Sequence, residues 1–340
     1  MKERVRALAS RSLVAGGFTA WGRRFGDRNG TIVLFGHRVR DDDEGYMQGL
    51  APTWFREQIA YLTRHYEVIP LRTLVDCLET GKSPPPRSVV LTLDDGFRDN
   101  AEEALPILDG FGVKATIFVV TQSLTDGRLP WSQRLGFAFQ HTSLTTLRHP
   151  WLGPDEVPLR DAASRRRAYL LVKRRLVAEP RQSRDAHIAT WARELGVALP
   201  DDRMMSWDDA RAALEHGHEI GAHTYSHALL AAVPPGEARE EMLRSRTDLA
   251  ERLGLDHPTF CFPGGSTNVE LCGLARSLGF RGTFLPHPGR RLNRVPDVDA
   301  FSMVRVGLPN APAYHLEAEL DGPFHTLRAW GGRYARLAKG

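Results

Sequence analysis

Long hydrophobic runs are missing from this 340-residue sequence, and so is any regular arrangement of cysteines. No stretch approaches the roughly 18 uninterrupted apolar residues that a membrane-spanning helix needs, and the mean hydropathy is −0.33. The three cysteines, Cys77, Cys261 and Cys272, are odd in number and form no Cys-x-x-Cys pair. These absences argue against a membrane-spanning protein and against a disulfide framework, and they favour a reducing compartment.

A large excess of one charge is also missing. The net charge of +4 and the isoelectric point near 9.1 fit an acidic surface or substrate as well as plain solubility. With 42% hydrophobic residues the chain can bury a sizeable core, either as one large domain or as a domain with an insertion. The basic runs at 165–167 and 173–175 lack interleaved aromatic residues, so they predict a solvated helix face and no nucleic-acid partner.

The first 30 residues place four basic residues before the apolar stretch 13–20, which superficially resembles a signal peptide. Two glycines and a threonine interrupt that stretch, and no small-residue cleavage site follows it. We therefore expect residues 1–30 to form a basic helical segment that lies on the chain's own core or on an anionic membrane surface. The expected location is the cytoplasm, with a peripheral membrane contact left open.

Short apolar strands alternate with helices from residue 31 onward, which predicts a parallel α/β sheet. We expect residues 31–325 to form the main domain, interrupted by a helical insertion over about 122–205, and residues 326–340 to form an amphipathic tail. Thr53 and Ser206 are expected helix caps, and Gly81 is an expected helix stop. The expected strands are 31–35, 68–71, 89–93, 114–120 and 219–222, and the expected helices are 53–66, 72–80, 100–111 and 206–215.

Two adjacent carboxylates, Asp94 and Asp95, follow the strand 89–93. Neighbouring strand residues point to opposite faces, so these two side chains can stay close only if the backbone turns, which Gly96 permits. Ligands in parallel α/β folds collect outside the carboxyl ends of the strands, so the pair indicates a site. The alternative is a capping Asp-Asp-Gly turn.

Three histidines occupy comparable positions. His37 follows the strand 31–35, and His223 follows the strand 219–222 with His227 four residues later. On a helical turn His223 and His227 would emerge on one face and could share a metal, although such a pair can also be a surface feature. Two imidazoles and one carboxylate suit zinc or a similar divalent ion, and the second carboxylate would be free as a base. The chemistry indicated is hydrolysis at an acyl carbon.

Three segments of the sequence are 92–96 (TLDDG), 223–227 (HTYSH) and 260–265 (FCFPGG). In this order they resemble the first three motifs of the polysaccharide deacetylases, the NodB-like carbohydrate esterase family four. The resemblance implies a distorted (β/α) barrel with a helical insertion and metal-dependent N-deacetylation of an N-acetylated sugar. It assigns Asp95, His223 and His227 to the metal and Asp94 to the base. Zinc is the expected ion, and other divalent transition metals are left open.

Two departures from the family pattern bear on the site. Many members carry an arginine in the third motif, where this sequence has Cys261, and a late Leu-x-His motif, which residues 301–308 (FSMVRVGL) lack. Residues 35–39 (FGHRV) are similar to an N-terminal motif of bacterial members that act on exopolysaccharides. His37 is therefore the candidate acid that protonates the leaving amine, the alternative being a strand-end histidine bonded to backbone.

The sequence thus predicts a metal-dependent hydrolase that removes N-acetyl groups from amino sugars of a polysaccharide or its lipid-linked precursor. Sequence motifs report the metal site and not the pocket, so an amidase acting on a small non-sugar amide stays open. A catalytically silent carbohydrate-binding protein is the third alternative.

Overall fold

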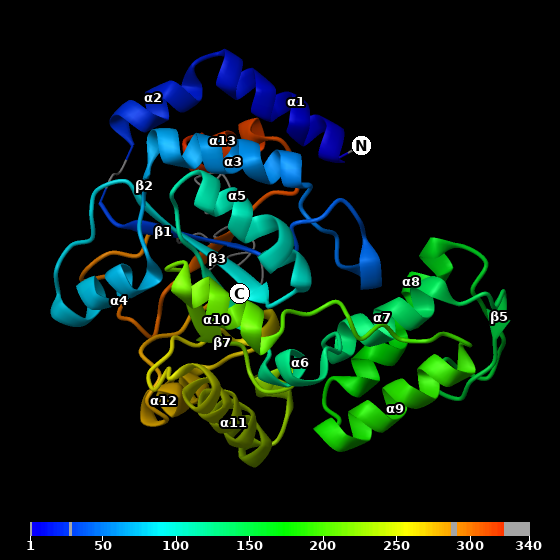
Figure 1. Cartoon of the computed structure of the whole chain (residues 1–340). Coiled ribbons are helices and arrows are strands. Elements are labelled where there is room, and N and C mark those ends of the chain that lie inside the picture. The colour runs from blue at the N-terminus through cyan, green and yellow to red at the C-terminus, as the bar shows by residue number, and fades with distance from the viewer. Residues whose placement is uncertain (1, 27–28, 287–290, 323–340) are drawn as a thin grey trace, which may run out of the picture.

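A parallel sheet of short apolar strands organises the computed structural model, which describes residues 2–26, 29–286 and 291–322 (Figure 1). The strand order is β7-β4-β3-β1-β8, with β2 beside β3, and all of these pairs are parallel. A separate antiparallel pair, β5 and β6, lies in the insertion. The strands are β1 (Thr31–Gly36), β2 (Glu67–Val68), β3 (Ser88–Asp95), β4 (Thr116–Val119), β5 (Thr146–Leu147), β6 (Val157–Pro158), β7 (Glu219–Ala222) and β8 (Arg305–Gly307).

Short bridges close this sheet between β7 and β8. Ala222 pairs in parallel with Phe260, the Phe260 amide donates to the Gly282 carbonyl at 2.9 Å, and Phe284 pairs in parallel with Met303. Since β8 then pairs with β1, the sheet curves into the distorted (β/α) barrel that the sequence resemblance implied.

Helices surround the barrel, and α1 and α2 form an outer layer over α3 and α13 (Figure 1). They are α1 (Lys2–Ala15), α2 (Phe18–Phe25), α3 (Pro52–His65), α4 (Leu71–Thr80), α5 (Leu105–Gly110), α6 (Thr121–Asp126), α7 (Trp131–His141), α8 (Ala162–Leu176), α9 (Arg181–Glu194), α10 (Trp207–Glu215), α11 (Pro235–Leu253), α12 (Val269–Ser277) and α13 (Ala313–Leu320). Single turns occupy Glu44–Tyr46, Asn100–Ala104, Leu230–Ala232 and Pro263–Gly265.

Of the three residues expected to cap or end a helix, Gly81 and Ser206 do so and Thr53 does not. Gly81 ends α4 in the left-handed conformation, and Ser206 caps α10 in a reciprocal capping box with Asp209. Thr53 is not a cap, because α3 already begins at Pro52 and Ala51 occupies the capping position. A proline fits the first helical position, where its missing N–H has no partner to lose.

The expected strand 68–71 is also wrong in its extent. Strand β2 covers only Glu67–Val68, and Leu71 begins α4 directly after Pro70. A proline cannot donate to a sheet ladder, so it ends the strand and starts the helix. The three cysteines are free, as the sequence predicted.

The insertion has a hydrophobic cluster of its own, which includes Trp131, Phe139 and Trp191, and lies to one side of the barrel (Figure 1). It is helical over α6 to α9 and also contains the β5–β6 pair. We still propose that the chain divides into an N-terminal segment 1–30, a main domain 31–325 and a tail 326–340. The expected tail lies outside the described residues. No helix in the described ranges is long and apolar enough to cross a membrane.

The end of β3 contains the turn that the sequence placed at Gly96. Strand pairing continues through Asp95, whose φ of 77° is in the left-handed region, as is the φ of 74° at Gly96. A Cβ at Gly96 would lie 3.0 Å from Val119 Cγ1. Two consecutive left-handed residues turn the chain away from the strand direction, and a side chain at the second would press against Val119.

Replacing Gly96 with alanine should therefore destabilise the protein more than the same change at Gly81. Gly81 also has a positive φ, 68°, but a Cβ there would meet nothing within 4 Å. We expect a loss of about 1 kcal/mol for Gly81→Ala, from backbone conformation alone. Gly96→Ala should lose a further ~1–3 kcal/mol from overpacking. Urea unfolding of both variants measures the difference, and equal losses would contradict the packing argument.

Candidate active site

Strand register brings the predicted site residues to one edge of the barrel. Gly36 pairs with Leu93, so His37 and Asp94 follow at the same level. Asp95 pairs with Val119, which pairs with Ala222, the residue before His223. The residues singled out in the sequence therefore converge because they follow neighbouring parallel strands.

Asp95, His223 and His227 form a buried cluster whose geometry fits a metal ion. The Asp95 Oδ1 lies 3.2 Å from His223 Nε2 and 3.1 Å from His227 Nε2, and their ligand atoms lie within 4.8 Å of one another. Yet Asp95 Oδ1 is buried and has no partner of hydrogen-bond geometry among the described residues. One carboxylate oxygen and two imidazole nitrogens therefore lie close together with no hydrogen bond from the described residues to satisfy the oxygen. Such a set of atoms suits the ligands of one divalent ion.

The His223 ring is oriented by a hydrogen bond on its other side. Its Nδ1 lies 2.7 Å from the Cys261 carbonyl oxygen, which can only accept, so Nδ1 carries the proton. In the neutral ring, Nε2 then has a lone pair that can bind an ion shared with Asp95. Metal-binding histidines are commonly fixed by such a bond to their second nitrogen.

The expectation that His223 and His227 share a helical turn is wrong. Residues 223–227 form an irregular loop, and Thr224 and His227 have φ values of 66° and 62°. Left-handed non-glycine residues are strained and persist only where the surroundings fix them. The loop, rather than a helical repeat, turns both imidazoles toward Asp95.

The insertion and α11 hold this loop in place. Trp131 Nε1 from α7 donates to the His227 carbonyl at 3.0 Å. The buried Arg184 from α9 donates to Ser226 Oγ at 2.9 Å, and the Ser226 amide donates to Glu241 on α11 at 2.7 Å. The insertion therefore supports a ligand loop in addition to lying beside the site.

Asp94 is held by a residue that the sequence reasoning missed. Arg305, from β8, donates to both carboxylate oxygens of Asp94, at 2.7 and 2.8 Å. Its side chain is 12% exposed, and its guanidinium carbon lies 4.6 and 4.8 Å from the ring centroids of Phe35 and Phe284. Burial raises the pKa of Asp94, but the charge and hydrogen bonds of Arg305 outweigh it, so the pKa lies below its ordinary value.

Arg305 thus supplies the positive charge that the third motif lacks. A signal for it exists in the sequence, because residues 301–308 contain one charged residue within an otherwise apolar strand. A charge is rarely buried in such a strand without a partner.

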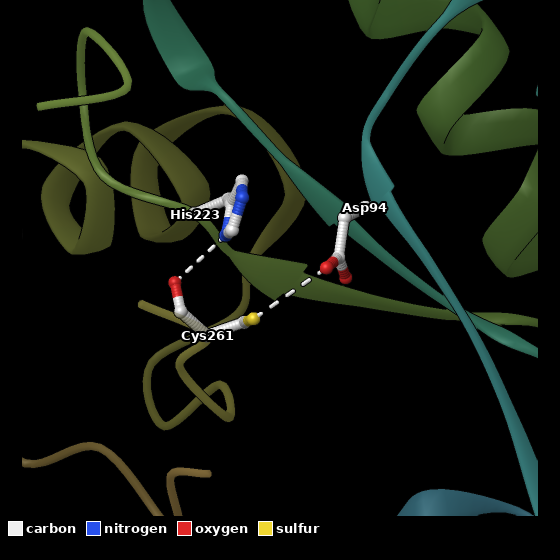
Figure 2. A group of neighbouring side chains, drawn as sticks. All are labelled: Asp94, His223 and Cys261. Carbon is white, nitrogen blue, oxygen red and sulfur yellow. Dashed lines mark hydrogen bonds between the residues drawn. The ribbon is translucent and has the colours of Figure 1, made fainter. Parts of the chain in front are cut away.

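A second group that could hold a metal shares His223 and adds Asp94 and Cys261 (Figure 2). Its donor atoms already have partners: Arg305 occupies both oxygens of Asp94, and the Cys261 thiol lies 3.8 Å from Asp94 Oδ2. Burial raises the pKa of the Cys261 thiol, which favours its protonated form. The Asp95 group therefore fits a metal better than this one.

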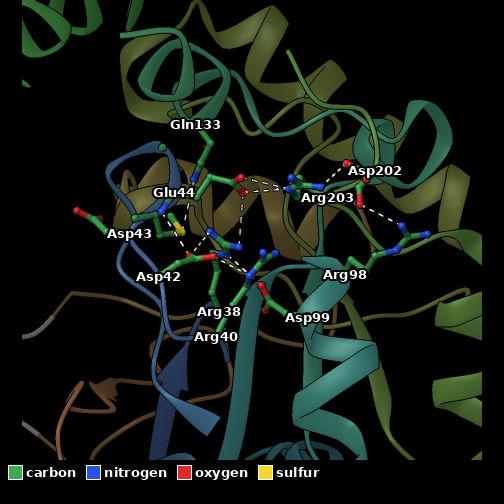
Figure 3. A network of polar contacts seen from close by, with 12 residues as sticks. Arg38, Arg40, Asp42, Asp43, Glu44, Arg98, Asp99, Gln133, Asp202 and Arg203 are labelled. Atoms are coloured by element: carbon green, nitrogen blue, oxygen red, sulfur yellow. Dashed lines mark hydrogen bonds and ion pairs between the residues drawn. The ribbon is translucent and has the colours of Figure 1, made fainter. Parts of the chain in front are cut away.

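His37 lies close to Asp94, and both residues line the same cavity. Its Nε2 is 4.0 Å from Asp94 Oδ2, and its side chain is 35% exposed. The Asn100 side chain donates to the His37 carbonyl at 2.7 Å. The next residue, Arg38, is buried in a polar network with Asp99 and Glu44 that fixes the loop after β1 (Figure 3).

These side chains line a cavity of about 380 Å³ bounded by Phe35, Phe262 and Phe284 as well as by His37, Asp94 and Arg305. A neighbouring cavity of about 230 Å³ shares Phe35 and His37 with it. The cavity offers an apolar aromatic wall, a carboxylate and an imidazole, and the group of Asp95, His223 and His227 follows at the same strand ends. These are the kinds of groups that hydrolysis of an acyl bond requires.

The family model described as polysaccharide deacetylase matches residues 81–283, more than half of the chain. The chain therefore belongs to the polysaccharide deacetylase family. It is 31% identical over 86 residues to the poly-beta-1,6-N-acetyl-D-glucosamine N-deacetylase of Escherichia coli K12. That alignment covers 24% of this chain and only 13% of the relative, so the chain spans a small part of that protein.

Solved structures share the fold. A Streptococcus pyogenes deacetylase, PplD in complex with acetate, has a TM-score of 0.56 at 17% identity, covering 85% of this chain and 97% of that chain. IcaB from Ammonifex degensii has a TM-score of 0.55 at 19% identity, covering 87% and 98%. The distorted barrel is thus shared over nearly the whole length of both proteins.

Arg305→Met should greatly lower the rate of acetate release while leaving metal binding intact. The variant removes the guanidinium that donates to both oxygens of the buried Asp94, and breaking one side of a buried ion pair costs about 3–5 kcal/mol. We expect acetate release to fall roughly 100-fold or more and metal content to be unchanged.

Arg305→Lys is the matched control, because it keeps the positive charge but loses the bidentate hydrogen bonding to Asp94 and the packing of a guanidinium on the aromatic rings. Its activity should lie between those of the native protein and Arg305→Met. Native turnover in Arg305→Met would refute the role given to this pair.

Proposed function

We propose that the protein removes N-acetyl groups from the amino sugars of a polysaccharide or its lipid-linked precursor. The observation that supports this most is the division of two adjacent carboxylates between different partners. Asp95 faces two imidazoles, and Asp94 faces Arg305 and His37. Family membership supports the deacetylase class, and the site supports hydrolysis by this particular chain.

Asp95, His223 and His227 would hold a divalent ion, for which zinc is the first candidate. The chemistry that such an ion supplies when bound is a lowered pKa for water and polarisation of a carbonyl oxygen. Asp94, kept ionised by Arg305, accepts a proton from the attacking water. His37, which is partly exposed and lies 4.0 Å from Asp94, donates a proton to the amine nitrogen as the C–N bond breaks and acetate leaves.

The two adjoining cavities support a substrate that extends beyond one acetamide group. The two cavities share Phe35 and His37 in their walls, so the proposed substrate, a chain of sugars, extends through both of them. The lipid-linked form of the substrate and the cytoplasmic location stay predictions from the sequence.

Asp94→Asn and Asp95→Asn should fail in different ways. Asp94→Asn should keep its metal and lose roughly 10²–10⁴-fold in turnover, because only the proton acceptor is removed. Asp95→Asn should lose the metal as well, because a charged ligand is gone. Metal content and acetate release from N-acetylglucosamine oligomers, with and without a chelator, measure both.

Near-native deacetylation by Asp94→Asn would overturn the assignment of the base. In the native protein, bound metal without acetate release from any glycan would instead indicate an amidase acting on another amide. The absence of both would indicate a carbohydrate-binding protein.

His37→Gln should lose amide hydrolysis far more than ester hydrolysis. An amine needs a proton to leave, whereas a nitrophenolate leaves without one, so an activated acetate ester bypasses the acid. The ratio of p-nitrophenyl acetate hydrolysis to N-acetylglucosamine oligomer deacetylation should rise in the variant. Equal losses on both substrates would give His37 a role other than proton donation.

A further inference from the structure

The two N-terminal helices expose an unusual share of the large apolar side chains. Seven such residues are exposed in the described part of the chain, and four of them are Leu8 on α1 and Phe18, Trp21 and Phe25 on α2. The three aromatic residues of α2 are 61%, 67% and 64% exposed. We call these three side chains the aromatic face of α2.

Helical spacing makes this a continuous surface. Phe18, Trp21 and Phe25 are separated by three and four residues, which places them on one side of an α-helix. The rings of Trp21 and Phe25 lie 5.5 Å apart. Scattered exposed apolar residues need no explanation, but a contiguous aromatic patch marks an interaction surface.

The polar side of α2 faces the protein, the reverse of an ordinary surface helix. Thr19 Oγ1 and Arg23 Nη1 both donate to Glu317 Oε1 on α13, at 2.7 and 2.6 Å. The Arg87 side chain donates to the Arg23 carbonyl at 3.0 Å, and the Asp321 backbone carbonyl packs directly against Gly22.

These contacts fix the rotation of the helix. Turning the aromatic face inward would break the Arg23–Glu317 ion pair, whose side chains are only 22% and 14% exposed. It would also drive side chains into the backbone that contacts Gly22. The fold therefore holds the aromatic face outward.

The charge around this face selects the partner. The sequence has five arginines and no acidic residue from Arg4 to Gly26. Arg11 and Arg24 are exposed, and the Arg24 guanidinium lies over the Phe25 ring, 5.7 Å from its centroid. Aromatic rings beside arginines on an amphipathic helix are typical of segments that lie in the headgroup region of an anionic bilayer.

We propose that the aromatic face of α2 docks on an anionic lipid bilayer, with Phe18, Trp21 and Phe25 entering the headgroup region and the neighbouring arginines contacting lipid phosphates. The docking holds the barrel at a membrane surface. This inference does not depend on the deacetylase chemistry, since none of its residues lines the active-site cavity.

Sedimentation of the full-length protein with vesicles tests the proposal. The protein should co-sediment with phosphatidylcholine vesicles that contain phosphatidylserine, and more weakly with phosphatidylcholine alone or at high salt. The triple variant, which combines Phe18→Ser, Trp21→Ser and Phe25→Ser, should bind the anionic vesicles at least roughly tenfold more weakly than the native protein. Because these side chains point outward, its melting temperature and acetate release from a soluble oligomer should match the native protein.

A matched control comes from α8, which is also basic and exposes Leu170 and Leu171 at 42% and 43%. Leu170→Ser with Leu171→Ser should leave vesicle binding unchanged. Native-like binding by the triple variant, or an equal loss in the α8 control, would overturn the proposal.

Trp21 fluorescence separates the bilayer from other occupants of this face. Compared with a Trp21→Phe variant, the native protein should show an emission component that acrylamide quenches in free solution and that shifts to the blue on anionic vesicles. If Trp21 is protected from acrylamide without lipid, the chain's own residues or a second copy cover the face. A concentration-dependent dimer that the triple variant abolishes identifies the second copy, and either result refutes membrane docking.

Discussion

The left-handed turn at Asp95 and Gly96 is the constraint on which the site depends. Two consecutive carboxylates on one strand would normally point to opposite faces of the sheet and repel each other if brought together. Because Asp95 has a φ of 77°, its carboxylate turns toward His223 and His227, while Asp94 stays at the level of His37. One left-handed turn thus gives two chemically identical side chains separate partners, on which the separate roles proposed for them rest.

Closure of the barrel supplies the second half of this arrangement. Strand β8 pairs with β1, so the end of the chain contributes Arg305 and the beginning contributes His37 to the same cavity. Arg305 offsets the cost of burying Asp94 and favours its ionised form, and the rings of Phe35 and Phe284 pack against the guanidinium. In the proposed reaction, the candidate metal ligands Asp95, His223 and His227 and the candidate proton donor His37 both act next to Asp94.

The sequence predicted what depends on local pattern and on parallel strand ends. The position of His37, Asp94, Asp95 and His223 at one barrel edge follows from apolar strands that each stop at a polar residue. It did not predict Arg305, because that pairing depends on barrel closure over more than 200 residues, nor the irregular 223–227 loop, because insertion contacts override its helical spacing. The outward aromatic face of α2 was equally hidden, since periodicity identifies two faces but not which one is turned to the protein.

In the proposed site Asp95, and not Asp94 or Cys261, shares the metal with two imidazoles. X-ray absorption spectroscopy of the zinc-loaded protein distinguishes these ligands, because Zn–S distances of about 2.3 Å differ from Zn–N and Zn–O distances of about 2.0–2.2 Å. We expect two imidazoles and oxygen ligands, no sulfur, and an unchanged spectrum in Asp94→Asn. A sulfur ligand, or a spectrum that changes in Asp94→Asn but not in Asp95→Asn, would contradict this assignment.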